Sequence, residues 1–152
     1  MAYTSESARL LLLDDLAAAV DALATAISAL GEAYDEVDEQ TADVLEQELF
    51  RPVQAAYGRA RRTHSEFAQR HELPGRQFAD GSPGLHSGDP RVYVERAIEA
   101  TERADHLIAE MQDSLLPVEV GDRELRDGLT EARELISAVP AQGRQLLRRI
   151  GR

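Results

Sequence analysis

The chain has 152 residues, of which 43% are hydrophobic and 30% charged, with a formal net charge of −11. This balance is typical of one folded globular domain, spanning 1–152, and excludes a disordered chain. Cysteine and lysine are absent, which excludes disulfides, thiolate metal sites, cysteine nucleophiles, lysine Schiff bases and a phosphate-loop lysine.

A heptad of apolar residues dominates the first third of the chain. Alternating steps of three and four residues place these side chains on one face of a helix that packs against other helices. Ser5 and Ser7 are both suitable N-caps, so we expect the helix to begin near one of them. The heptad residues are Leu13, Leu16, Val20, Leu23, Ile27, Leu30, Tyr34, Val37, Thr41 and Val44.

Gly31 leaves two interpretations of this heptad open. In the first, the chain turns at about 31–36 and a second helix begins among residues 35–38. In the second, one helix continues unbroken to about Phe50, as the intact heptad phase across Gly31 indicates. The ordinary length of helices in globular proteins favours the turn.

The next long helix ends at about His71 and contains a proline. Pro52 removes a backbone donor and clashes with the preceding turn, which predicts a kink or a break. The following segment, 73–89, holds four of the ten glycines of the chain. It is longer than most connections in a bundle, and we predict a mobile loop here.

Two further helices complete the predicted architecture. Asp89 and Pro90 are a clear N-cap and first helical residue. Asp122 can cap the last helix, in which Pro140 predicts a second kink. We therefore predict an all-α fold, a four-helix up-and-down bundle with long, proline-kinked helices.

Helical bundles often hold metal ions with carboxylates and histidines that project into the core. A row of acidic and histidine side chains on the third helix, which we call the polar row, lies opposite the apolar stripe of that helix and is therefore predicted to face solvent. The polar row is Glu95, Glu99, Glu102, His106, Glu110 and Asp113. His64 and His71 of the second long helix lie at the edge of an apolar stripe, which favours hydrogen bonding to the backbone. We expect no bound metal and no cofactor; the candidates are His64, Glu99, Glu102 and His106.

Pairs with Glu-x-x-Glu spacing, Glu36 with Glu39 and Glu99 with Glu102, suit a hard cation such as Mg²⁺. All-α nucleotide pyrophosphohydrolases hold magnesium with carboxylates spaced in this way. A divalent-metal-binding bundle protein, or an enzyme similar to these pyrophosphohydrolases, is therefore the alternative function.

Arginines near the end of the second long helix and in the loop beyond it could receive an anion or an acidic surface. Charge balance near a helix C-terminus explains most of the same cluster. These candidates are Arg59, Arg61, Arg62 and Arg76. A third kind of site, a pocket closed by the 73–89 loop, would be lined by Tyr34, Tyr57, His64 or Tyr93.

The negative charge is unevenly distributed. Residues 1–50 contain twelve acidic residues against Arg9 alone, while residues 51–152 contain sixteen of each sign. Nucleic acid and anionic membranes need clustered cations and are therefore poor partners. A basic protein surface fits better, including the arginine-rich half of a second copy.

No catalytic motif accompanies these features. We expect a cytoplasmic protein, since no cationic leader is visible. The leading hypothesis is a non-enzymatic interaction or structural module that self-associates through its helices as a homo-oligomer, with a dimer as the first expectation.

Overall fold

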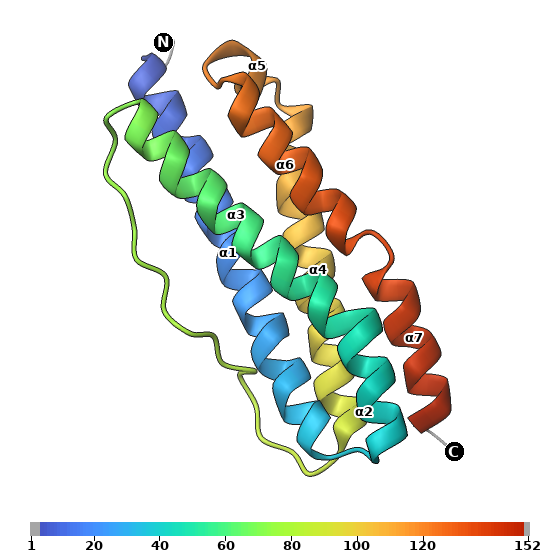
Figure 1. The fold of residues 1–152 in the computed structure, drawn as a ribbon. Helices are drawn as coiled ribbons and strands as arrows, with labels where there is room; N and C mark the ends of the chain where they lie inside the picture. Colours follow the sequence, from blue (N-terminus) through green and yellow to red (C-terminus); the bar gives the residue numbers. More distant parts are fainter. Residues whose placement is uncertain (1–3, 151–152) are drawn as a thin grey trace.

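The protein is a bundle of long helices, as Figure 1 shows for a computed structural model that describes residues 4–150. These residues contain no β-strand, and the all-α prediction is confirmed. None of the helices in this range is long and apolar enough to cross a membrane. The elements are α1 (Ser5–Asp35), α2 (Glu39–Leu45), the π-helical η1 (Glu46–Phe50), α3 (Arg51–Arg70), α4 (Pro90–Asp113), α5 (Leu116–Glu119), α6 (Arg123–Ile136) and α7 (Val139–Ile150).

The four-helix bundle is confirmed, and its connections include one long crossover. α1 packs antiparallel to α4, and α3 packs antiparallel to α6. Between α3 and α4 the chain returns along the length of the bundle, so these two helices run in the same direction (Figure 1). Four-helix bundles with one such crossover are an established alternative to the strict up-down-up-down connection.

α1 begins at Ser5, as expected, and ends at Asp35, but its N-cap is a different residue from those expected. Thr4 is the N-cap, because its Oγ1 accepts a hydrogen bond from the Ser7 amide at 3.1 Å, so the expected caps Ser5 and Ser7 are wrong. The helix passes through Gly31, where an added Cβ would meet nothing within 4 Å. Both α3 and α4 pack against α1, which buries its alanines together with the heptad leucines.

The chain turns at residues 36–38, so the turn is correct and the unbroken helix to Phe50 is wrong. Asp38 caps α2, since its Oδ1 accepts a hydrogen bond from the Thr41 amide at 2.7 Å. The turn comes after Gly31 rather than at it. One glycine costs a helix only about 1 kcal/mol, which the burial of its neighbours outweighs.

Pro52 is accommodated without interrupting the helical path from α2 to α3. The five residues before α3 form the π-helical turn, in which the Arg51 amide donates to the Glu46 carbonyl five residues earlier. The wider turn changes the hydrogen-bond register just ahead of the proline, which lies in the first turn of α3. The sequence predicts a kink or a break at Pro52; the break does not occur, and the local change in the helix is a π turn.

Pro140 breaks its helix, where the sequence predicts only a kink. α6 ends at Ile136, and Ser137 donates from both its amide and its hydroxyl to the Glu134 carbonyl. Because Pro140 has no amide hydrogen, the α-helical bond from residue 140 to the Ile136 carbonyl cannot form. The apolar stripe survives the break, because Ile136, Val139 and Leu146 are all buried.

Residues 73–89, which we call the strap, cross the bundle in an extended conformation. The strap contacts defined partners: Arg76 pairs with Asp21 of α1 at 2.9 Å, and the Pro83 carbonyl accepts from Arg96 at 3.0 Å. Gly81 lies so close to α1 that an added Cβ would be 2.3 Å from the Ala24 carbonyl oxygen. These contacts define the path of the strap, and its mobility stays a prediction.

Candidate functional site: an arginine-lined groove between α3 and the strap

One groove on the surface of the bundle gathers three of the predicted anion-binding arginines. This groove, of about 690 Å³, lies between the outer side of α3 and the first residues of the strap. We call it the arginine groove. Its lining residues are Gly58, Arg61, Arg62, Ser65, Glu66, Arg76, Gln77 and Phe78.

Arg61 and Arg62 supply the cationic side of the groove from consecutive positions on α3. Both are exposed, and neither forms an ion pair with any residue in the described range 4–150. The Arg61 guanidinium lies 5.3 Å from the centroid of the Tyr57 ring, a cation–π contact that helps to orient it. Planar guanidinium groups bind carboxylates and phosphates through paired hydrogen bonds, so this groove suits an anionic group.

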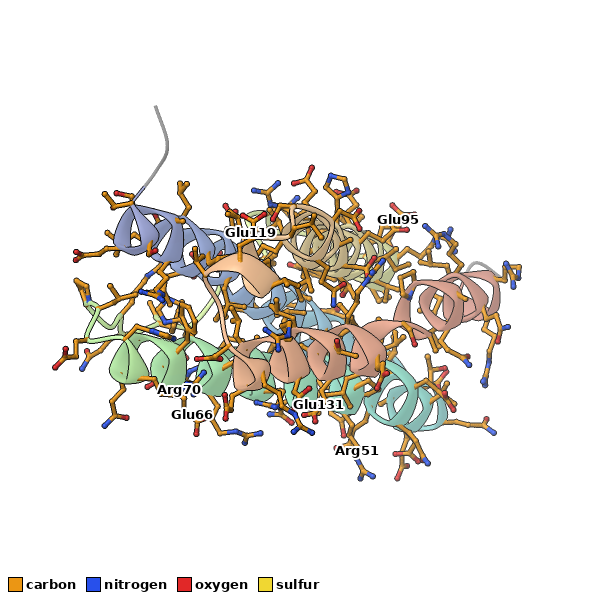
Figure 2. All side chains as sticks on the ribbon, turned by 90° about the horizontal axis from the view of Figure 1, so that it is seen from above. Arg51, Glu66, Arg70, Glu95, Glu119 and Glu131 are labelled. Atoms are coloured by element: carbon orange, nitrogen blue, oxygen red, sulfur yellow. The ribbon has the colours of Figure 1, made fainter. Side chains whose placement is uncertain are left out.

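Arg76 reaches the same groove from the strap. Its guanidinium donates to Asp21 at 2.9 Å and lies 4.8 Å from the centroid of the Phe78 ring. The Arg76 charge is therefore partly neutralised, and Glu66 adds one carboxylate to the lining. Figure 2 shows Glu66 projecting from α3 away from the bundle core.

Arg59 does not belong to the groove. It pairs with Glu131 of α6 and donates to the Thr63 hydroxyl at 3.0 Å, so it links α3 to α6. Three of the four predicted anion-binding arginines are thus brought together, and the fourth is a structural link. The sequence gives no signal for this difference, because the partner of Arg59 is 72 residues away in the chain.

The candidate metal ligands are not gathered into one site. Glu99 lies 3.6 Å from Arg96, Glu102 accepts from Arg144 at 2.9 Å, and His106 lies 3.0 Å from Glu110. All of these α4 side chains are exposed, as the position of the polar row predicts. Over residues 4–150, no group of three or more His, Asp or Glu side chains is arranged to hold a metal ion.

His64 lies apart from the other candidates, inside the bundle. Its exposed fraction is 3%, and its Nδ1 has no hydrogen-bond partner in the part of the chain that the structure describes. Burial, and next the Arg76 charge, lower the pKa of His64, while the Leu13 backbone and Asp14 act in the opposite direction. This histidine is therefore neutral near pH 7, and it is buried more deeply than its place at the edge of a stripe indicates.

The tyrosines proposed to line a ligand pocket have separate surroundings. Tyr57 borders a shallow hollow of about 220 Å³ together with Asp80 and Gly81 of the strap. Tyr93 is buried, and its hydroxyl accepts a hydrogen bond from the Ser87 amide at 2.8 Å. Tyr34 is 44% exposed. These side chains do not define one ligand pocket.

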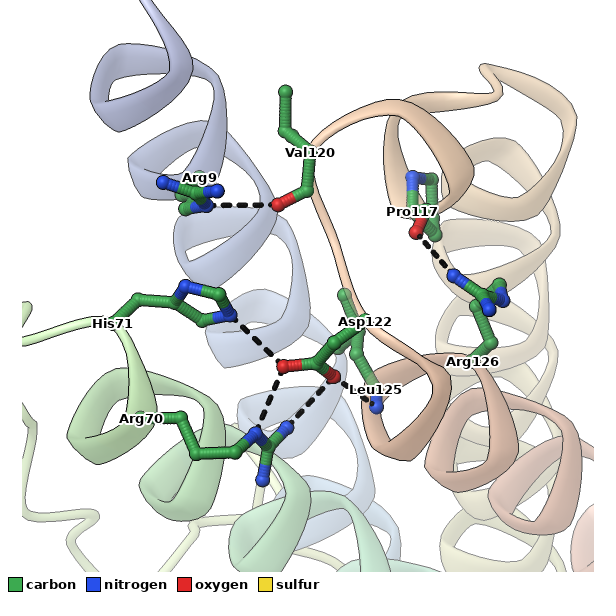
Figure 3. Close-up of polar contacts among 8 residues, drawn as sticks. All are labelled: Arg9, Arg70, His71, Pro117, Val120, Asp122, Leu125 and Arg126. Carbon is green, nitrogen blue, oxygen red and sulfur yellow. Dashed lines mark hydrogen bonds and ion pairs between the residues drawn. The ribbon is translucent and has the colours of Figure 1, made fainter.

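A polar junction that the sequence does not reveal holds the end of α3 against the start of α6 (Figure 3). Both Asp122 oxygens accept from Arg70 at 2.8 Å, and His71 Nε2 lies 2.9 Å from Oδ2. Asp122 also caps α6, accepting from the Leu125 amide at 2.8 Å. Burial alone would raise the pKa of Asp122, but the hydrogen bonds from Arg70, Leu125 and His71 lower it to about 2.

Comparisons with known proteins do not assign this chain to a family: no protein-family model, no curated protein and no solved structure matches it. The arginine groove is therefore interpreted from its own residues.

Proposed function

We propose that the protein is a non-enzymatic interaction module that self-associates, with the arginine groove of one copy binding the acidic α1–α2 end of another. The observation that carries this proposal is the pair of exposed arginines, Arg61 and Arg62. They lack ion-pair partners within residues 4–150 of a chain whose net charge is −11. Groups with unneutralised charge are suited to steer and align an oppositely charged partner.

The complementary surface lies at the turn between α1 and α2. Six carboxylates there are exposed, and none has an ion pair in the described part of the chain. Four residues of this turn line a shallow depression of about 430 Å³: Asp38, Glu39, Gln40 and Asp43. The six acidic residues, which we call the acidic end, are Glu32, Asp35, Glu36, Asp38, Glu39 and Asp43.

One chain does not bring its own acidic end to its own arginine groove. Asp43 and Arg61 lie on the continuous helical path from α2 through α3. A separation of 18 residues along a helix corresponds to about 27 Å, well beyond ion-pair distance. Contact between the two surfaces therefore requires a second copy, and a two-fold dimer would form it twice.

Reversing the charges tests this contact. We expect Arg61→Glu with Arg62→Glu to weaken self-association at least about tenfold, as measured by sedimentation or light scattering over micromolar concentrations. Glu39→Arg with Asp43→Arg should weaken it similarly. A mixture of the two double variants should restore association, because each supplies the surface that the other has lost. Association of the wild type should weaken as salt rises from 50 to 500 mM.

The matched control is Arg103→Glu with Arg123→Glu, which changes the net charge by the same amount at exposed positions outside the groove. This variant should lose much less association. A wild-type chain that stays monomeric at 100 μM would refute the proposal, and so would equal loss in the groove and control variants.

A further inference from the structure

His64 is a buried, titratable side chain that takes no part in the proposed self-association. It projects from α3 and is 3% exposed, yet its Nδ1 has no partner among the described residues. A buried imidazole nitrogen without a partner is costly, and a protonated imidazole in the same place would be costlier still. The surroundings of His64 are therefore suited only to the neutral ring.

The strap covers this histidine. The Phe78 ring packs edge-on against the His64 ring, with the ring centroids 5.1 Å apart. The Arg76 guanidinium lies 4.8 Å from the centroid of the Phe78 ring and pairs with Asp21 on α1, so residues 76–78 span from α3 to α1. The exposed fractions of the Arg76 and Asp21 side chains are 47% and 48%. Solvent therefore screens this ion pair, and it contributes little to the stability of the closed strap.

Few other contacts hold the middle of the strap. The backbone amides of residues 75–82 form no hydrogen bond to the rest of the described chain. The next fixed points are Gly81 against the Ala24 backbone and Pro83 bonded to Arg96. The packing of Phe78 on His64 is therefore a main contact of residues 74–80 with the bundle.

Charged groups near His64 lie on the two segments that pack against it, the strap and α1. The strap contributes Arg76, whose positive charge opposes a proton on the imidazole, and α1 contributes Asp14, which favours it. Burial, followed by Arg76, outweighs the Leu13 backbone and Asp14, and the pKa of His64 is lowered from its ordinary 6.5. Release of the strap would expose the His64 ring to water and would also move the Arg76 charge away from it.

We propose that His64 and residues 74–82 form a pH-sensitive switch, in which protonation of the buried imidazole releases the strap from the α1–α3 face. Arg76, Gln77 and Phe78 form one wall of the arginine groove, so release also dismantles the groove. This last consequence rests on the proposed function, whereas release of the strap does not.

The direction and size of the effect follow from proton linkage. The closed state binds a proton less readily than the open state, in which His64 is exposed to water and titrates near 6.5. The ratio of open to closed molecules therefore rises as the pH falls below about 6.5. Between pH 7.5 and pH 5.5 this ratio should increase about tenfold, provided that the closed state stays unprotonated.

A tryptophan reporter measures the strap directly, because the chain contains no tryptophan of its own. In Phe78→Trp, we expect quenching by acrylamide to increase as the pH falls from 7.5 to 5.5. Adding His64→Gln should abolish this dependence, since glutamine takes up no proton. His86→Gln, which alters an exposed histidine in the strap itself, should leave the dependence intact.

Nuclear magnetic resonance of the unmodified protein provides the second measurement and guards against disturbance by the tryptophan. The amide signals of residues 75–82 should shift with the same midpoint as the His64 imidazole. Strap signals that stay constant from pH 7.5 to 5.5 would overturn the switch. So would a pH response that persists in His64→Gln.

Both measurements follow the strap within one chain and do not depend on contact between two copies. They therefore succeed or fail independently of the self-association experiments above.

Discussion

Replacing Asp122 by asparagine should lower the free energy of unfolding by about 2 kcal/mol at neutral pH. The pKa of Asp122 falls from 3.8 to about 2 in the folded protein. At about 1.4 kcal/mol per pH unit, this difference means that the ionised carboxylate stabilises the fold by about 2 kcal/mol relative to its protonated form. The side chain is only 21% exposed, so solvent screens the interaction weakly.

Asparagine separates the charge of Asp122 from its role as a helix cap, because asparagine is itself a good N-cap. Asp122→Ala removes both and should cost about 1 kcal/mol more than Asp122→Asn. Urea unfolding followed by circular dichroism measures both variants. For a chain of this length, a loss of 2 kcal/mol corresponds to a decrease in Tm of about 4–8 °C.

The pH dependence gives a stricter test. A carboxylate with a lowered pKa stabilises the fold fully above the unfolded-state pKa, 3.8, and loses this contribution as the pH falls toward 2. The difference between wild type and Asp122→Asn should therefore shrink to about half between pH 7 and pH 3. A loss below about 0.5 kcal/mol at pH 7, or a difference that is unchanged at pH 3, would refute the reasoning.

Two further predictions concern helix packing and metal binding. Gly128→Ala should destabilise the protein by about 1–3 kcal/mol, because its Cβ would lie 2.1 Å from the Oγ1 of buried Thr63. The control Gly31→Ala, whose Cβ meets nothing within 4 Å, should stabilise by about 0.5–1 kcal/mol in the same thermal unfolding experiment; equal effects would contradict the packing argument. Millimolar Mg²⁺ or Mn²⁺ should leave Tm unchanged within about 1 °C, because residues 4–150 contain no cluster of three suitable ligands. An increase of several degrees would instead favour the metal-binding alternative.

Features that depend on local chemistry were predictable from the sequence. Asp89 and Asp122 cap their helices as expected, because the cap and the amide that it binds are only two or three residues apart. The exposed polar row of α4 follows from helical periodicity in the same way. In contrast, Thr4, Ser5 and Ser7 are equally suitable caps, and only the structure identifies Thr4.

Features that depend on distant parts of the chain were not predictable. Pro52 and Pro140 impose the same local restriction, yet the first follows a π turn and the second follows a break. The difference depends on packing, since α7 lies against both α4 and the π turn after the change of direction.

The same distinction applies to the candidate site: the sequence identifies its residues but not their arrangement in space. The sequence identifies Arg61, Arg62 and Arg76 as candidates but not the path of the strap that brings Arg76 to α3. Extended segments carry no periodicity from which such a path could be read. The burial of His64 beneath Phe78 depends on the same path.

The crossover divides the molecule into two helical hairpins, α1–α3 and α4–α7, which are joined covalently only through the strap. The most extensive helix pairing, α1 with α4, lies between these halves rather than within one of them. Two chains that exchanged their C-terminal halves would therefore reproduce this pairing without any new interface. The length of the strap makes the architecture intrinsically compatible with domain swapping.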